Sequence, residues 1–65
     1  MKTDYEIHVV LEHGDWMLYL IPDYPPGPPI IGIDVGDRAR GIAAASQIAQ
    51  GLETAGMTVG KVFDD

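Results

Sequence analysis

The sequence predicts an α+β fold of order β-β-β-α-β, with one helix on one face of a mainly antiparallel four-stranded sheet. Three observations support this. An alternating segment at 5–12 and an unbroken apolar run at 16–21 flank a turn sequence. A third apolar segment follows, and the one long stretch with helical periodicity comes after it, at 38–55. With 65 residues, the chain has room for a single small domain over 1–65.

The first two segments predict a hairpin of defined register. Residues 5–12 alternate between apolar and polar positions, and Gly14 accepts a positive φ, so His13–Gly14 is expected to form a two-residue loop. The resulting register gives one wholly apolar face, with the pairs Leu11–Trp16, Val9–Leu18 and Ile7–Leu20. The opposite face is mixed but rich in large side chains, with the pairs Val10–Met17, His8–Tyr19 and Glu6–Ile21.

The next segment is a proline-rich connector. All five prolines fall within residues 22–29, which therefore cannot form a helix or an inner strand. We expect a stiff loop with a turn at Gly27, and the alternative is a ligand for an aromatic groove. Residues 30–35 then predict a third strand whose shared apolar face holds Ile31, Ile33 and Val35.

The remaining chain predicts a helix and a returning strand. Asp37 suits the N-cap of a helix over 38–55, and Gly56 suits the position after its end. The apolar stripe of this helix is thin and alanine-rich, and consists of Ile42, Ala45, Ile48, Ala49 and Leu52. Residues 57–63 are expected to form an edge strand with Met57, Val59 and Phe63 as its apolar positions. A right-handed crossover through the helix lays this strand parallel to the first and gives the sheet order 3-2-1-4.

The composition excludes several classes of function. The net charge of −6 disfavours direct nucleic-acid binding and suits a basic protein partner. The chain has no cysteine and two histidines, so neither a disulfide nor a structural zinc site is expected, and no cofactor is implied. The sequence shows neither a signal peptide nor an apolar run as long as a membrane span. We therefore expect a cytoplasmic protein that makes no contact with a membrane.

Two groups of polar residues are candidates for a chemical site. Asp23, Asp34 and Asp37 are of the type that holds two metal ions in nucleases, but they are expected on a loop, a strand face and a helix cap. His8 and His13 have an odd spacing, and a strand turns to its opposite face at each step. Surface or local structural roles are the better interpretation for all five, so no enzymatic activity is expected.

Several segments resemble a known family. VVLE at 9–12, GDWMLYLIPDYP at 14–25 with Gly27, and VGD at 35–37 ahead of the helix resemble the HicB-type antitoxins. The resemblance spans about residues 5–55, and its motifs are hairpin and turn signals. It implies a reduced ribonuclease-H-like β-β-β-α-β fold. It also implies neutralisation of a small basic ribonuclease toxin by covering its active site.

The chain departs from that family in three ways. Arg38-Ala39-Arg40 stands where the family has an acidic helix start, the loop carries extra prolines, and no DNA-binding module follows. Two hypotheses for function therefore stand. One is a HicB-like antitoxin that binds a basic ribonuclease by protein–protein contact. The alternative is a small self-associating accessory protein, phage- or plasmid-borne, that binds an unrelated host protein.

The candidate partner-binding site is the sheet face opposite the helix. A chain of this length has little left to cover that face, and large apolar side chains gathered there indicate an interface. Its expected apolar members are Val10, Met17, Tyr19 and Ile21. The simplest partner is a second copy in a two-fold homodimer, sheet against sheet.

Charged and loop residues complete the predicted site. Glu6, Glu12 and Asp15 are expected grouped at the hairpin, where they would attract a basic partner. Tyr24 is expected beside the apolar residues. An alternative is that the proline-rich loop folds back and Tyr24 itself covers this face.

Overall fold

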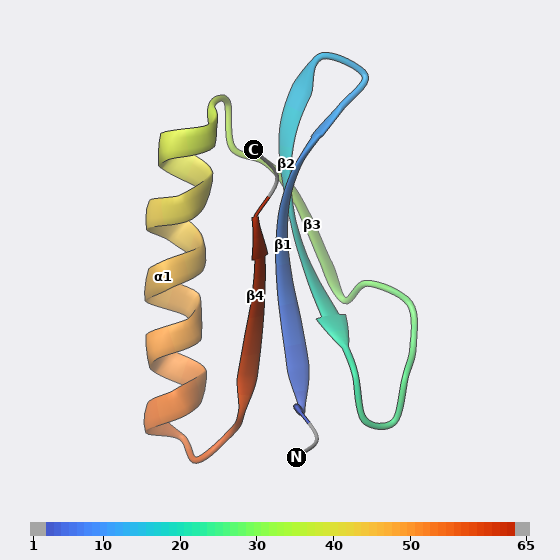
Figure 1. Cartoon of the computed structure of the whole chain (residues 1–65), viewed down its shortest axis with the longest axis vertical. Helices are drawn as coiled ribbons and strands as arrows, with labels where there is room; N and C mark the ends of the chain where they lie inside the picture. Colours follow the sequence, from blue (N-terminus) through green and yellow to red (C-terminus); the bar gives the residue numbers. More distant parts are fainter. Residues whose placement is uncertain (1–2, 64–65) are drawn as a thin grey trace.

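The computed structural model of the chain describes residues 3–63. The elements in chain order are β1 (Tyr5–Glu12), β2 (Asp15–Pro22), β3 (Ile31–Asp34), α1 (Arg38–Thr54) and β4 (Val59–Phe63). The strands form one sheet in the order β3-β2-β1-β4, and α1 lies along one side of it (Figure 1). β2 is antiparallel to both of its neighbours, whereas β4 runs parallel to β1. The predicted fold class and strand order are therefore confirmed.

The hairpin loop sets the register of the first two strands. His13 and Gly14 have φ values of 52° and 83°, and positive φ at both positions is what the favoured two-residue hairpin turn requires. The loop aligns Val9 with Leu18 and Val10 with Met17, as predicted. Because a slip of one residue would reverse every side chain, the turn decides which face of the sheet becomes the core.

The core lies between α1 and the two central strands. Its fully buried members are small or medium apolar side chains from three elements: Ile7, Val9, Leu18, Leu20, Ala45 and Ala49. Trp16, Ile48 and Leu52 are half-buried and pack against this cluster. The two helix alanines present little bulk to the sheet, so the helix can lie close to β1 and β2.

The helix packs tightly against the sheet at Gly41, which the sequence analysis did not place in the core. A Cβ at this position would lie 2.7 Å from Cγ1 of Val9 and 3.0 Å from Cγ2 of Val35. Ile42, predicted on the apolar stripe, lies outside the core cluster instead. Gly41 occupies the position that faces the sheet. Ile42 is one residue further around the helix and therefore points away from the core.

Replacing Gly41 tests this close approach. We expect Gly41→Ala to lower the free energy of unfolding by about 1–3 kcal/mol, because the added methyl group overlaps packed side chains. Gly51→Ala is the matched control, since a Cβ at Gly51 meets nothing within 4 Å. It should stabilise the protein by about 0.5–1 kcal/mol through helix propensity alone. Urea denaturation of both variants measures the contrast, and equal effects would contradict the close packing at Gly41.

The ends of the elements lie close to their predicted positions: β3 is Ile31–Asp34 rather than 30–35, and α1 ends at Thr54 rather than at residue 55. The Asp37 carboxylate accepts the Arg40 N–H at 2.8 Å, which confirms the predicted N-cap, and Gly56 has φ 92° after the helix end. β4 begins at Val59 rather than at the predicted residue 57. Met57 therefore lies outside the strand, where its N–H donates to the carbonyl oxygen of Leu52 and its side chain is 38% exposed. The backbone at Met57 closes the helix instead of extending the sheet.

A single helix leaves much of the sheet without cover. α1 approaches β1, β2 and β4 but not β3, and it occupies only one side of the sheet (Figure 1). The helix-side residues of β3, Ile31 and Ile33, are accordingly 36% and 44% exposed. The whole opposite side of the sheet is also left without a second layer among the described residues.

A candidate partner-binding face

The outer face is the side of the sheet opposite α1. Strand alternation and the observed register assign its members by parity, because the core residues Ile7, Val9, Leu18 and Leu20 define the other side. Its members are Glu6, His8, Val10 and Glu12 of β1; Asp15, Met17, Tyr19 and Ile21 of β2; Gly32 and Asp34 of β3; and Gly60 and Val62 of β4.

The centre of the outer face is apolar. Val10 and Met17 are directly opposite each other on neighbouring strands, and the sequence-predicted Tyr19 and Ile21 continue along β2. These four side chains are half-buried by their neighbours. Val62 lies across from His8 and is 44% exposed, so β4 widens the apolar centre. The sequence analysis missed Val62, because its place depends on the register of the parallel pair.

Carboxylates border this apolar centre on three of the four strands, β1, β2 and β3. Glu12 and Asp15 face each other at the hairpin end, as predicted, but Glu6 is opposite Ile21. Six strand residues, about 20 Å, separate Glu6 from Glu12, so the expected grouping of all three acids at the hairpin is wrong. Asp34, opposite Met17, is a fourth acid that the prediction left out. The outer face of the described strands carries no lysine or arginine, so its field is negative at both ends of β1 and beside β3.

Tyr19 is fixed in place on this face. Its hydroxyl donates to Oε1 of Glu12 at 2.6 Å, and its ring lies against Gly32, where a Cβ would be only 3.1 Å from Cε1 of the ring. The hydrogen bond to Glu12, aided by partial desolvation and by the carboxylate charge, raises the pKa of Tyr19 above its ordinary 10.0. The glycine in β3 thus makes room for the tyrosine, and the acid at the hairpin orients it.

The Tyr19–Glu12 bond predicts a pH dependence. Because the pKa of Tyr19 is raised in the folded state, its contribution to stability is present below pH 10 and is lost as the pH rises through the folded pKa. We expect the ring carbons of Tyr19 to titrate above its ordinary pKa of 10.0 in an NMR titration. Glu12→Ala should lower that pKa toward 10. An unchanged titration in the variant would contradict the bond.

The other polar groups of interest have local partners. His8 Nε2 lies 3.0 Å from Oε1 of Glu6 on the outer face, whereas His13 is in the hairpin loop. Asp23 accepts a hydrogen bond from the Thr3 hydroxyl, and Asp34 accepts the Gly36 N–H at 3.0 Å. Within residues 3–63, no three histidine, aspartate or glutamate side chains gather into a group that could hold a metal ion.

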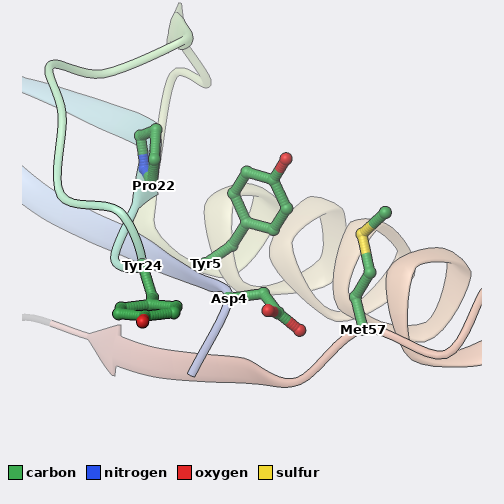
Figure 2. A pocket seen from close by; sticks show the side chains of 5 residues that line it. All are labelled: Asp4, Tyr5, Pro22, Tyr24 and Met57. Atoms are coloured by element: carbon green, nitrogen blue, oxygen red, sulfur yellow. The ribbon is translucent and has the colours of Figure 1, made fainter. Parts of the chain in front are cut away.

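Tyr24 is not brought to the outer face. It lines a pocket of about 210 Å³ at the end of the sheet near the helix C-terminus, together with Asp4, Tyr5, Pro22 and Met57 (Figure 2). The expectation that Tyr24 joins Met17 and Tyr19 is therefore wrong, and so is the alternative in which it covers them. The position of Tyr24 follows from the path of the proline-rich loop. That path depends on backbone contacts that cannot be predicted from a proline-rich sequence.

Hydrogen bonds hold the walls of this pocket together. The Asp4 carboxylate accepts the Thr58 N–H at 2.9 Å, and the Asp4 carbonyl oxygen accepts the Asp23 N–H at 3.0 Å. These bonds tie the start of β1 to the end of β2 and to the segment before β4. Two tyrosine rings beside a carboxylate are groups that attract organic cations. The pocket is small and open, and it lies apart from the apolar centre of the outer face.

No protein-family model, curated protein or solved structure matches the chain. Function is therefore inferred from the residues and their geometry. No helix within residues 3–63 has the length and apolar character needed to cross a membrane.

Proposed function

We propose that this chain is a non-catalytic protein-binding module of the HicB-like antitoxin type, which neutralises a small basic ribonuclease by protein–protein contact. The outer face is the contact surface. The observation that carries the proposal is the apolar centre of that face, with Val10, Met17 and Tyr19 bordered by carboxylates at both ends of β1 and on β3. The β-β-β-α-β order also agrees with the fold that the family resemblance implies.

The charges on the outer face favour a basic partner over a second copy at this surface. Two copies placed sheet against sheet would set four carboxylates against four others: Glu6, Glu12, Asp15 and Asp34 on each side. Like charges held close together at an interface cost several kcal/mol. A basic protein instead gains attraction from the same groups and covers the apolar centre.

This chemistry suits the inhibition of a ribonuclease in particular. An enzyme that binds RNA presents lysine and arginine side chains to the phosphates. The carboxylates around the outer face can pair with those same side chains, while Met17 and Tyr19 pack against the surface between them. Methionine and tyrosine are enriched in the centres of protein interfaces. The bound module would then exclude RNA by occupying the surface on which RNA binds.

The first test is whether a small basic reading frame adjoins the gene for this chain, because its absence would contradict the proposal. The product of such a frame is then purified and assayed for RNA cleavage. We expect the chain to abolish cleavage at equimolar ratio. Association should slow as ionic strength rises past about 0.1 M, where exposed charges are screened beyond about 10 Å. Cleavage that continues in an excess of the chain contradicts the proposal. Association that ignores ionic strength contradicts the electrostatic part of it.

A further inference from the structure

β3 is an edge strand whose outer side is open. It lies at the end of the sheet order, and no described strand pairs with its free side. α1 does not approach it, so Ile31 and Ile33 are 36% and 44% exposed on the helix side. Proteins usually protect such an edge with lysine, proline or a bulge. The four residues of β3, Ile31–Asp34, contain no lysine or proline.

The other edge of the sheet is protected. β4 carries Lys61, which is opposite Ile7 and therefore projects on the helix side of the sheet. A charged residue that points inward at an edge is a common device against strand pairing. α1 also lies close to β4. The two edges of the same sheet thus differ, and only β3 offers both free backbone groups and exposed isoleucines.

The hydrogen-bond pattern shows which backbone groups of β3 face outward. The Val35 N–H donates to the carbonyl oxygen of Trp16 at 3.0 Å. Since antiparallel strands alternate in the direction of their backbone groups, Ile33 and Ile31 also face β2. The alternation ends at Ile30, whose N–H donates to the carbonyl oxygen of Leu20 at 2.8 Å and so also faces β2. Gly32 and Asp34 therefore direct their N–H and C=O groups away from the sheet.

We propose that a second copy of this chain pairs with β3, antiparallel and two-fold symmetric about Gly32, to give one continuous eight-stranded sheet. At the two-fold axis, Gly32 exchanges both of its backbone hydrogen bonds with Gly32 of the second copy. This proposal is independent of the ribonuclease partner. It uses the edge of the sheet and leaves the outer face open to another protein.

The side chains around this axis are self-complementary. The register places Ile31 opposite Ile33 of the second copy, and the two-fold symmetry repeats this pair. Both pairs lie on the helix side of the sheet, where α1 leaves space. Asp34 falls opposite Ile30 of the second copy, so no carboxylate faces another across the seam. On the outer face, the absence of a side chain at Gly32 lets the two Tyr19 rings, each resting on its own Gly32, approach the axis. Each copy therefore gains an apolar strip and paired backbone groups without a like-charge contact.

A matched pair of lysine substitutions tests the proposed pairing of β3 with β3 of the second copy. Ile33 and Val62 are both 44% exposed, and they lie on the two opposite edge strands. Either Ile33→Lys or Val62→Lys reduces the net charge of −6 by one unit, so a difference between them cannot come from overall repulsion. We expect the wild type and Val62→Lys to reach twice the 7.0 kDa of one chain in light scattering as concentration rises. Ile33→Lys should remain at 7.0 kDa throughout.

Hydrogen exchange gives a second measurement that needs no substitution. The Gly32 amide should gain protection as the concentration of the wild type rises, whereas the Val35 amide, bonded within the sheet, should be protected at every concentration. Added salt should strengthen this dimer, because it screens the repulsion between two acidic copies. That direction is opposite to the one expected for a basic partner.

Three results would overturn the proposal. One is a wild type that stays at 7.0 kDa at its highest soluble concentration. Another is a dimer in which the Gly32 amide exchanges as fast as in the monomer, because the pairing would then lie elsewhere. The third is an Ile33→Lys variant that is folded by circular dichroism and dimerises as strongly as the wild type.

Discussion

Leu18→Ala is expected to lower the free energy of unfolding more than any other substitution considered for this protein. Leu18 is completely buried at the centre of β2, between β1 and α1. Truncating a buried leucine costs about 2–5 kcal/mol, because apolar contacts are lost and a cavity remains. A domain of this size has a total stability of about 3–10 kcal/mol. The substitution therefore removes a large share of it, which thermal and urea unfolding monitored by circular dichroism will measure.

Leu11→Ala is the matched control for this prediction. Leu11 is in the neighbouring strand, at its hairpin end, and its side chain is 51% exposed. The same truncation there should cost much less than at Leu18, since little buried surface is lost. The assignment of the buried face would be contradicted if Leu18→Ala and Leu11→Ala had the same melting temperature, close to that of the wild type.

The sheet could be predicted from the sequence because its signals are local. Loop length and glycine at position 14 fix the hairpin register, and the alternation in 5–12 then decides which side chains share a face. The Asp37 cap and Gly56 mark the helix in the same local way. The strand order follows from the handedness of the crossover, which is a general rule rather than a property of these residues.

The parts that escaped prediction depend on contacts between distant segments. From the sequence, Gly41 is a residue of low helix propensity. Only the positions of Val9 and Val35 in the structure show that a larger residue would not fit there. Val62 joins the outer face through the register of β4 on β1. The course of the proline-rich loop carries Tyr24 to the pocket, where backbone bonds at Asp4 and Asp23 hold the surrounding segments together.

The grouping of the acidic residues could have been predicted correctly from the sequence, but the prediction was wrong. Glu6 and Glu12 are on the same strand and the same face, but six residues apart, so they cannot both be at the hairpin. The corrected arrangement changes the electrostatics of the outer face. Negative charge stands at both ends of the apolar centre, and Asp34 adds to it at the β3 side. A basic partner can therefore be held at several points, which favours a defined orientation over simple attraction.

Met17→Glu is expected to abolish tight binding of the proposed basic partner while the fold remains intact. Met17 is half-buried at the centre of the outer face, between Val10 on β1 and Asp34 on β3. A carboxylate there would be desolvated under the partner and would repel Asp34. Loss of a central interface residue costs about 2–4 kcal/mol, which corresponds to about 30- to 700-fold weaker binding. Titration calorimetry at fixed ionic strength measures the change.

Met57→Glu separates the loss of a contact from the change in charge. Met57 is 38% exposed in the segment before β4 and is not on the outer face, so the same substitution adds the same negative charge elsewhere. Both variants should attract a basic partner at long range as well as the wild type does, and their association rates should stay similar. Only Met17→Glu should release the partner faster, because the apolar centre no longer packs against it. Equal dissociation rates for the two variants would mean that the partner binds away from the outer face.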